Sequence, residues 1–450
     1  MRKTDVLVVG GSASGIVAAT TAKAFHPGKS VLLVRREKQV LTPCGIPYIF
    51  ATLRGIDQDL IPDRVLLNAG VDLLIDEVVA VDQEAKTCAT AGGETIGFEK
   101  LVLALGSVPS VPKTFRGKER ENLFLIPKDK EYLERMVRRL GECGSVIIVG
   151  GGFIGVEVAD ELTKSGKRVT LIEKLPHVLE LAFDPELTIK AEEILKDRGV
   201  NVVAGVGVRE VMGKGRVTGV RLESGEEIKS DAVILATGYI PATGLAEAAG
   251  IPLNRMGFVQ VNEYMMTENR DVFAVGDCAE KKSFITRDSI PVMLASTACA
   301  EARIAAMNLY SLSAVKTFGG TIAIYSTAVG TTAFGVAGVK ENLARERGFD
   351  IVTGSFQGAD KHPGTMPGTQ IQLVKLIASR ESGVIIGGQV MGGDGTGELT
   401  NLIGIMIQNR MTVSSIMTAQ IGTHPLLTAP PTAYPLTRAA MAITLSYRHG

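Results

Sequence analysis

The sequence has no tryptophan, few other aromatic residues and no excess of charge of either sign. Of its 450 residues 5% are aromatic, and 48 basic residues balance 48 acidic ones. A balanced charge gives no electrostatic footprint for nucleic acid or for an anionic membrane surface, so neither is expected as a partner. With 45% hydrophobic residues and 51 glycines, the chain can bury a large core and make many tight turns. Its length predicts two to four domains.

Cysteine is scarce as well. The cysteines are odd in number and far apart: Cys44, Cys88, Cys143, Cys278 and Cys299. They fit neither a disulfide framework nor the CxxC spacing of a zinc site, so no metal is expected. Because free thiols are typical of a reducing compartment, we expect a cytoplasmic protein.

Long hydrophobic runs are also lacking, with one window to consider. Residues 317–339 carry no charge over 23 positions. The window is rich in Gly, Thr and Ser, which is typical of strands and turns rather than of a membrane helix. We therefore predict strands in a buried or interfacial position here, and no membrane span.

Two glycine-rich loops occur in similar surroundings. Residues 10–15 read GGSASG, between an apolar strand and an alanine-rich helix that should reach Phe25. Residues 150–155 read GGGFIG, a full GxGxxG between a strand and a helix. In this context the glycines allow a tight turn and a close approach of a pyrophosphate, which the helix N-terminus attracts. The first loop, with Ser12 in place of the middle glycine, is less specific and could be a plain turn.

A second strand follows each loop and ends in charged residues. Glu173 closes the strand 168–173, where a carboxylate accepts a hydrogen bond from a ribose 2′-hydroxyl and repels a 2′-phosphate. This favours NADH over NADPH, although Lys174 beside it weakens the argument. After the first loop the residues are Arg35-Arg36-Glu37. Either Glu37 contacts the ribose, or the arginines contact phosphate, or the three form a solvated charge cluster.

The rest of the chain contains two similar segments and a last third of different composition. Residues 98–112 (FEKLVLALGSVPSVP) and 228–241 (IKSDAVILATGYIP) share an apolar strand, a glycine turn and a proline, which indicates two related units. Another short strand ends in Gly276-Asp277, where the acid could accept from a ribityl hydroxyl or could simply end a strand. From about Lys316 the composition predicts an α+β unit without a nucleotide loop.

Cys44 lies alone in the stretch LTPCGIPY. No cysteine stands near enough in sequence for a local dithiol, so a partner sulfur would have to come from a ligand. A helix N-terminus after Cys44 could lower the pKa of the thiol. Without other motifs, a small buried hydrophobe would be the commoner role of such a residue.

Taken together, these motifs resemble the FAD-dependent pyridine nucleotide-disulfide oxidoreductases over nearly the whole chain. Within that family the sequence is similar to the single-cysteine branch, namely coenzyme A-disulfide reductases, NAD(P)H persulfide reductases and NADH oxidases. The resemblance implies an α/β fold with two Rossmann-like three-layer domains and a C-terminal α+β dimerisation domain in a homodimer. The FAD-binding domain would comprise residues 1–115 and 245–315, the NAD-binding domain 116–244 and the dimerisation domain 316–450.

The resemblance also implies roles for individual residues. Cys44 would be the redox-active thiol, and His424, in Thr-His-Pro, would be an acid lent across the dimer; a structural or surface histidine is the alternative. The residues implied around FAD are Gly10, Ser12, Ala13, Ser14, Gly15, Arg35, Arg36, Glu37, Val79, Ala104, Gly106, Gly276, Asp277, Ala295, Ser296 and Thr297. Those implied around NADH are Gly150, Gly152, Phe153, Ile154, Gly155, Glu157, Glu173, Lys174 and Gly238.

The implied reaction carries electrons from NADH through FAD to Cys44, which reduces a disulfide or persulfide through a mixed disulfide. Coenzyme A disulfide, coenzyme A persulfide and polysulfide are the candidate substrates. Peroxide- and oxygen-reducing relatives have a histidine where Ala13 stands, which favours thiol chemistry. The tyrosines of coenzyme A-disulfide reductases are replaced by Thr365 or Met366 and by Thr428, which weakens the link to coenzyme A.

Two alternatives stay open. The first is an NADH oxidase in which Cys44 passes through a sulfenate. The second is an electron-transfer flavoprotein that serves a partner protein, with Cys44 in a structural role.

Overall fold

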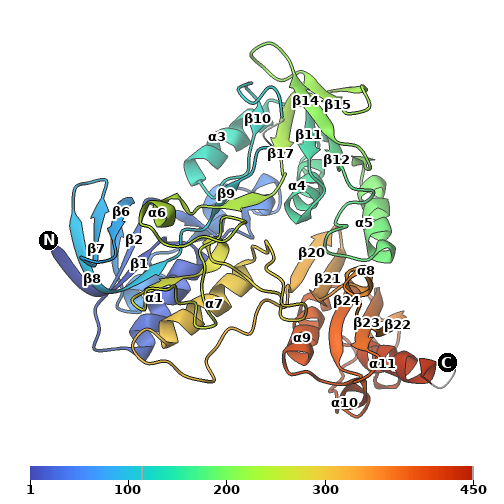
Figure 1. Cartoon of the computed structure of the whole chain (residues 1–450). Helices are drawn as coiled ribbons and strands as arrows, with labels where there is room; N and C mark the ends of the chain where they lie inside the picture. Colours follow the sequence, from blue (N-terminus) through green and yellow to red (C-terminus); the bar gives the residue numbers. More distant parts are fainter. Residues whose placement is uncertain (113–114, 448–450) are drawn as a thin grey trace.

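The computed structural model describes residues 1–112 and 115–447 and contains three α/β units (Figure 1). The first unit is built on a seven-stranded sheet in which β5, β2, β1 and β8 follow one another in parallel, and β19 also pairs in parallel with β8. An antiparallel pair, β7 and β6, extends the sheet beyond β8. The strands are β1 (Arg2–Val9), β2 (Val31–Arg35), β5 (Asp72–Ile75), β6 (Val78–Asp82), β7 (Thr87–Thr90), β8 (Thr95–Leu103) and β19 (Val272–Ala274).

Two alanine-rich helices cover this sheet and lie side by side (Figure 1): α1 (Ala13–Phe25) and α7 (Ala295–Met307). Small side chains let helix backbones approach closely, and the fully buried alanines share one core with the strands. These alanines are Ala18, Ala19, Ala22, Ala302, Ala305 and Ala306. The close packing fixes the first glycine loop, which begins α1, against a helix from much later in the chain.

Short elements complete the first unit. The strands β3 (Val40–Leu41) and β4 (Leu60–Ile61) form a small antiparallel pair around the segment that holds Cys44. The short helices of this unit are η1 (Ile46–Phe50), η2 (Ile56–Asp59), α2 (Arg64–Asn68), α6 (Gly244–Ala248) and η3 (Gly276–Cys278).

The second unit is inserted in sequence between β8 and β19. Its five-stranded sheet is parallel throughout, in the order β10-β17-β11-β12-β13. The elements are β10 (Leu123–Phe124), α3 (Lys130–Gly141), β11 (Ser145–Val149), α4 (Phe153–Lys164), β12 (Arg168–Ile172), α5 (Pro185–Asp197), β13 (Asn201–Val203) and β17 (Ala232–Leu235). An antiparallel extension consists of β14 (Val208–Met212), β15 (Gly219–Leu222) and β16 (Glu227–Lys229). A two-stranded ribbon, β9 (Ser107–Pro109) with β18 (Tyr239–Pro241), joins this unit to the first.

The third unit is an antiparallel five-stranded sheet in the order β20-β21-β24-β23-β22. The strands are β20 (Tyr325–Val329), β21 (Thr332–Gly338), β22 (Ile351–Ala359), β23 (Ile371–Ser379) and β24 (Ile385–Gly392). The helices are α8 (Glu341–Glu346), α9 (Thr396–Gln408), α10 (Val413–Met417), η4 (Pro431–Ala433) and α11 (Pro435–Ser446). This architecture confirms the predicted fold class of two Rossmann-like sheets and a C-terminal α+β unit.

The side chains of β21 point alternately to two different cores, which joins the third unit to the second. Phe334 and Val336 share a core with the second unit, whereas Ala337 belongs to a core with α9 and α11. Successive strand residues face opposite sides, so the sheet is covered by its own helices on one face and by the second unit on the other. The buried Lys375 reinforces this contact, because its Nζ lies 2.9 Å from Asp184 of the second unit.

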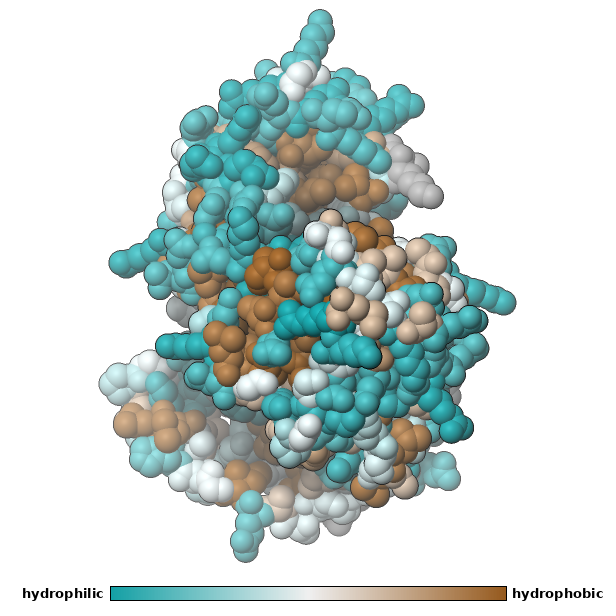
Figure 2. All heavy atoms as spheres, turned by 90° about the vertical axis from the view of Figure 1, so that its left-hand side faces the viewer, coloured by the Kyte–Doolittle hydropathy of each residue, from teal (hydrophilic) through white to brown (hydrophobic). Residues whose placement is uncertain are grey.

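The uncharged window 317–339 forms the strands β20 and β21, as predicted. Among the described helices, none combines the length and the apolar composition that crossing a membrane requires. Figure 2 shows one face of the molecule, which is mainly hydrophilic with a hydrophobic patch near its centre.

Candidate active site

The two glycine loops have the same backbone conformation. Gly10 and Gly150 both have φ of 109°. A β-carbon at Gly10 would lie 2.2 Å from the carbonyl oxygen of Ala104, and one at Gly150 would lie 2.4 Å from that of Ala236. Glycine is therefore required at both positions by φ and by the close approach of backbone. Ala104 and Ala236 lie in the two similar segments 98–112 and 228–241, so the similarity between these segments in sequence corresponds to a repeat in the structure.

The helices that follow the loops have N-termini open to an anion. α1 begins after Ser12 and α4 begins after Gly152. At neither of these described positions does a side chain form a hydrogen bond that caps the helix. The first turn of each helix contains no acidic residue, so nothing there competes with an anion for the free N–H groups or the positive end of the helix dipole. A β-carbon at Gly152 would meet only open space. Both sites fit the pyrophosphate of a dinucleotide.

A cavity of about 520 Å³ opens beside the first loop. Its wall includes Gly10 and Ser12 of the loop, residues 35–37 after β2, and Ala104 and Gly106 after β8. This volume lies in the range of cofactor and small-molecule sites. The predicted residues of the first loop, the second strand and the segment 98–112 therefore meet at one site.

Val79 stays a prediction. Its side chain is 53% exposed, and the preceding residue Val78 lines the cavity. The pairing of β6 with β7 shifts register between Val78 and Ala80, so Val79 lies at an irregularity of the strand. A contact with the cofactor at Val79 would have to come from its backbone.

Arg35 lies across the first loop but is fully engaged by the protein. It is 2% exposed, and its guanidinium donates to the carbonyl oxygen of Glu37 at 2.8 Å and to Asp63 Oδ1 at 2.6 Å. Its aliphatic stem fills the space where a β-carbon of Gly11 would be, 2.4 Å from Arg35 Cδ. The hypothesis that the arginines contact phosphate is therefore not supported for Arg35. Arg36 and Glu37, joined by a 2.7 Å ion pair, stay candidates on the cavity wall.

Glu173 lies across the second loop in the corresponding place. Its Oε2 accepts from the N–H of Gly151 at 2.5 Å, and its Oε1 accepts from the N–H of Leu175 at 2.7 Å. Lys174 is directed elsewhere: its exposed side chain lies 3.6 Å from Glu223. The backbone thus orients a carboxylate at the loop, which is the arrangement that a ribose-binding role needs.

The turn at Gly276 and Asp277 touches the first loop. Gly276 has φ of 77°, and a β-carbon there would lie 2.5 Å from Ser14 Oγ. Asp277 Oδ2 accepts from Ser107 Oγ and Lys128 Nζ, both at 2.7 Å. Burial by itself would raise the pKa of Asp277, but the charge and hydrogen bond of Lys128, with the hydroxyl of Ser107, outweigh it and hold that pKa below its usual value.

Ser107 and Lys128 were not predicted from the sequence. Ser107 directly follows the predicted Gly106, so its position in the turn was a usable signal. Lys128 comes from the second unit, just before α3, and its pairing with Asp277 depends on how the units dock. No local pattern around Lys128 indicates this.

Cys44 is exposed, and charged groups from both units act on its thiol. Loss of bulk water raises the pKa of Cys44 above its ordinary value, and the negative charge of Glu157 adds to this effect. Lys128 opposes it. The helix that follows Cys44 is only the short 3-10 helix η1, and desolvation is the largest influence on the pKa of this thiol.

The Cys44 segment rests on a buried carboxyl group. A β-carbon at Gly45 would lie 1.8 Å from Asp59 Oδ1, and the N–H of Thr42 donates to the carbonyl oxygen of Asp59 at 2.8 Å. Asp59 is 4% exposed, its Oδ2 has no hydrogen-bond partner among the residues described, and burial raises its pKa to about 6. This contact explains why glycine follows the cysteine.

Glu157 connects α4 with the third unit. Its Oε1 accepts from Thr327 Oγ1 of β20 at 2.8 Å. Burial raises the pKa of Glu157 to about 7, although the hydrogen bond from Thr327 opposes the shift. One helical turn earlier, Phe153 stacks on Tyr325 with ring centroids 5.0 Å apart and planes 6° from parallel. The start of α4, with its predicted nicotinamide-binding residues, is therefore held against β20.

Replacing Glu157 with glutamine should make stability less dependent on pH. The folded-state pKa of about 7 lies above the ordinary glutamate value of 4.5, so the favourable contribution is complete below pH 4.5 and is lost as pH rises through 7. We expect E157Q to gain stability relative to the wild type between pH 5 and 8, on the order of 1 kcal/mol because solvent screens a partly exposed group. Thermal unfolding of both proteins across this range measures the difference. A constant difference would contradict the prediction.

His424 is exposed in a loop before η4. Its Nδ1 accepts from the N–H of Leu426 at 3.2 Å, which leaves Nε2 directed away from that contact. Among the residues described, no hydrogen bond joins His424 to the Cys44 segment of the same chain. A role for His424 therefore requires a second subunit and stays a prediction.

The two stretches that replace the expected tyrosines lie together. His362 directly precedes one of them, its N–H donates to the carbonyl oxygen of Pro425 at 3.1 Å, and its Nδ1 lies 3.0 Å from the carbonyl oxygen of Thr428. These contacts place the start of the stretch 363–368 beside the segment 425–428 of the third unit.

The remaining predicted residues lie at strand and helix ends. Gly106 and Gly238 have φ of 73° and 90°, and a β-carbon at either would meet only open space. Ala295 and the exposed Ser296 begin α7, whereas the buried Thr297 shares a 3.0 Å hydrogen bond with Thr321. Ala13 and Gly15 lie in the first turn of α1, and Ile154 lies in the first turn of α4.

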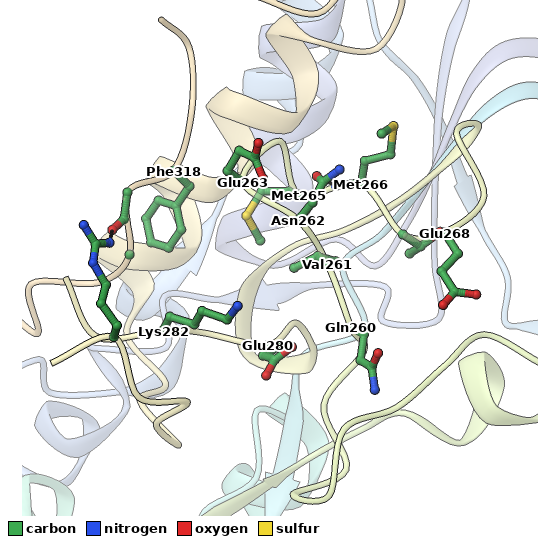
Figure 3. Close-up of a pocket in the computed structure, with 14 residues that line it drawn as sticks. Gln260, Val261, Asn262, Glu263, Met265, Met266, Glu268, Glu280, Lys282 and Phe318 are labelled. Carbon is green, nitrogen blue, oxygen red and sulfur yellow. Dashed lines mark hydrogen bonds between the residues drawn. The ribbon is translucent and has the colours of Figure 1, made fainter. Parts of the chain in front are cut away.

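A larger cavity of about 630 Å³ lies away from these residues (Figure 3). It is lined by three segments, residues 260–268, 280–287 and 318–320. Figure 3 shows Met265, Lys282 and Phe318 reaching it from these different segments. Its wall contains no predicted site residue and mixes acidic with basic side chains.

Comparison with known proteins agrees with this geometry. The pyridine nucleotide-disulphide oxidoreductase model matches residues 4–302, and the dimerisation domain model of the same family matches residues 324–434. An NAD(P)H sulfur oxidoreductase (CoA-dependent) of Pyrococcus abyssi is 31% identical, with 87% of this chain and 88% of that protein covered. An NADH oxidase of Enterococcus faecalis is 29% identical, with 94% and 96% covered.

A solved structure adds a further likeness. An NAD-dependent persulfide reductase from A. fulgidus superposes with a TM-score of 0.91 at 26% identity, covering 99% of this chain and 84% of that one. The chain belongs to the pyridine nucleotide-disulphide oxidoreductase family, and it is therefore an oxidoreductase whose cofactors are FAD and a nicotinamide nucleotide.

Proposed function

We propose that this protein is an NADH-dependent flavoprotein reductase whose single redox-active cysteine, Cys44, reduces coenzyme A-type disulfides or persulfides, or polysulfides. The observation that carries the proposal is the exposed, unpaired Cys44 thiol, on which charges of both nucleotide-binding units act. Because the Cys44 sulfur has no disulfide partner among the described residues, we propose that its disulfide is made with the substrate.

Named relatives support this choice of chemistry. The similar proteins include a CoA-dependent sulfur oxidoreductase and a persulfide reductase. Both names describe reduction of sulfur compounds with a nicotinamide nucleotide. The preference for NADH rests on Glu173, whose carboxylate is fixed at the second loop.

Bound FAD would supply the hydride-accepting centre that links NADH to sulfur chemistry. The chain itself has three tasks. The N-termini of α1 and α4 bind the two pyrophosphates, and Asp277 orients the polar part of the first cofactor. Cys44 attacks a sulfur–sulfur bond as its thiolate, which the positive charge of Lys128 favours. The sulfur–sulfur bond of the substrate breaks, and the leaving sulfur takes up a proton, for which we propose His424 of the second subunit in a homodimer. The mixed disulfide left on Cys44 would be reduced by the two electrons that NADH supplies through bound FAD, which returns the Cys44 thiolate and releases the remaining thiol or sulfide.

The substrate is proposed to be small or only loosely bound through coenzyme A. Thr365 or Met366 stands where coenzyme A-disulfide reductases have one tyrosine, and Thr428 stands in the place of the other, so no phenol group can contribute from these positions. A cytoplasmic location and the lack of a nucleic-acid partner stay predictions from composition.

An anaerobic turnover assay tests the function. The holoenzyme is given NADH with coenzyme A disulfide, coenzyme A persulfide or polysulfide, and release of thiol or sulfide is followed together with NADH oxidation. With at least one substrate we expect a fixed yield per NADH consumed: two thiols from coenzyme A disulfide, one thiol and one sulfide from coenzyme A persulfide, or sulfide from polysulfide. NADH oxidation that requires oxygen and ignores every sulfur substrate would refute the proposal.

The second candidate is an NADH oxidase, which the Enterococcus faecalis relative of that name favours. Ala13 argues against it, because this position offers no histidine to assist peroxide or oxygen chemistry. The same assay, repeated with oxygen or hydrogen peroxide as the sole acceptor, separates the two functions.

A further inference from the structure

A buried ion pair lies directly behind the turn that contains Asp277. The side chains of Lys281 and Glu301 have no exposed surface, and Lys281 Nζ lies 3.6 Å from Glu301 Oε2. Burying two charges has a large desolvation cost, so such a pair is weak evidence for added stability. Its presence beside a cofactor-binding turn therefore calls for another role.

Both members of the pair hold the peptide groups of Gly276. Lys281 Nζ donates to the carbonyl oxygen of Gly276 at 2.6 Å and to that of Ala279 at 3.1 Å. The N–H of Gly276 donates to Glu301 Oε2 at 2.8 Å. On its opposite side Gly276 abuts Ser14 of α1. The turn is thus enclosed between the first glycine loop in front and the ion pair behind.

The charge of Lys281 also has a local function for Glu301. Burial raises the pKa of Glu301 to about 7, and Lys281 is the charged neighbour that opposes this shift. The second oxygen, Oε1, has no hydrogen-bond partner within the described chain. Without Lys281 the carboxyl would tend to keep its proton and would be a weaker acceptor for the Gly276 N–H.

We propose that Lys281 and Glu301 are positioning residues that fix the Gly276–Asp277 turn for FAD. Their side chains have no exposed surface, so they would act on the cofactor through the backbone of Gly276, which precedes Asp277. The inference rests on the FAD-binding role proposed for this turn. It assigns a purpose to two buried charges that the proposed chemistry does not use.

The test measures how tightly FAD is held. The dissociation constant of FAD is obtained from flavin fluorescence on serial dilution of the full-length holoenzyme, for wild type, K281M and E301Q. We expect K281M to bind FAD about tenfold more weakly, because a charge-assisted hydrogen bond to the turn is lost. E301Q keeps the acceptor but loses the charge and should show a smaller change in the same direction. K282M is the matched control: Lys282 is the exposed neighbour on the wall of the other cavity, and its replacement should leave the constant unchanged.

A double-mutant cycle with D277A shows whether the pair acts through the turn. If it does, adding K281M to D277A weakens FAD binding by much less than K281M does in the wild type. Fully additive effects, or lower melting temperatures with wild-type FAD affinity, would overturn the inference. Should K281M fail to fold, K281M/E301L removes both charges together; this variant should fold and still release FAD more readily, and wild-type affinity in it would equally refute the role.

This readout is independent of the sulfur substrate. If the protein proved to be an NADH oxidase, the proposed function would fail while the FAD measurements kept their meaning. Conversely, unchanged FAD affinity in K281M and E301Q would remove the inference and leave the sulfur assay untouched.

Discussion

Replacing Cys44 with serine should lower the turnover of sulfur substrates by a thousandfold or more, on the order of the loss seen when an enzyme loses its nucleophile. Serine cannot form a mixed disulfide, so the sulfur–sulfur bond of the substrate is no longer attacked. Oxidation of NADH with an artificial electron acceptor should persist, because the nucleotide loops do not depend on the thiol. The two activities are measured on the same C44S preparation.

Cys88 provides the control for this experiment. It is a buried residue of β7, and the C88A variant should keep sulfur turnover. If C44S retained sulfur turnover as C88A is expected to do, Cys44 would be a structural residue, as in an electron-transfer flavoprotein that serves a partner protein. Loss of both activities in C44S would point to a folding defect, which the flavin content of the preparation reveals.

Glu173 should set the choice between NADH and NADPH. With its carboxylate fixed by the N–H groups of Gly151 and Leu175, a 2′-phosphate would meet a negative charge, and such like-charge contacts cost several kcal/mol. We expect the wild type to favour NADH in kcat/KM by about a hundredfold, and E173Q to lose most of this preference by gaining activity with NADPH.

The matched control is E193Q, which removes an exposed acid from α5 at a distance from the loop. It should leave the ratio of kcat/KM values unchanged. A wild-type preference for NADPH would contradict the role given to Glu173. So would an E173Q variant that lost activity with both nucleotides equally, because uniform loss indicates damage to the loop and not to discrimination.

Much of the fold was predictable because its signals are local. The glycine loops predicted their strands and helices, and α1 ends at Phe25 as expected. The uncharged window 317–339 was correctly interpreted as strands from its composition. The domain bounds at residues 115, 245 and 315 stay predictions.

The site was less predictable wherever contacts join distant segments. The pairing of Lys128 with Asp277 spans two units and leaves no trace in either local sequence. The side chain that lines the cavity in β6 is that of Val78, and the irregular pairing of β6 beside it is not visible in the sequence. The pKa of Cys44 could not be derived from the sequence, because desolvation and the charge of Glu157 depend on the packed structure.

The matching φ of Gly10 and Gly150 has a consequence for how such a chain can arise. One backbone design, duplicated within a single polypeptide, would already have offered two anion sites before any specialisation. The side chain that crosses each loop then differs in sign, a guanidinium at Arg35 and a carboxylate at Glu173. The two units thus keep the same phosphate-binding backbone while the residue that crosses it carries the opposite charge.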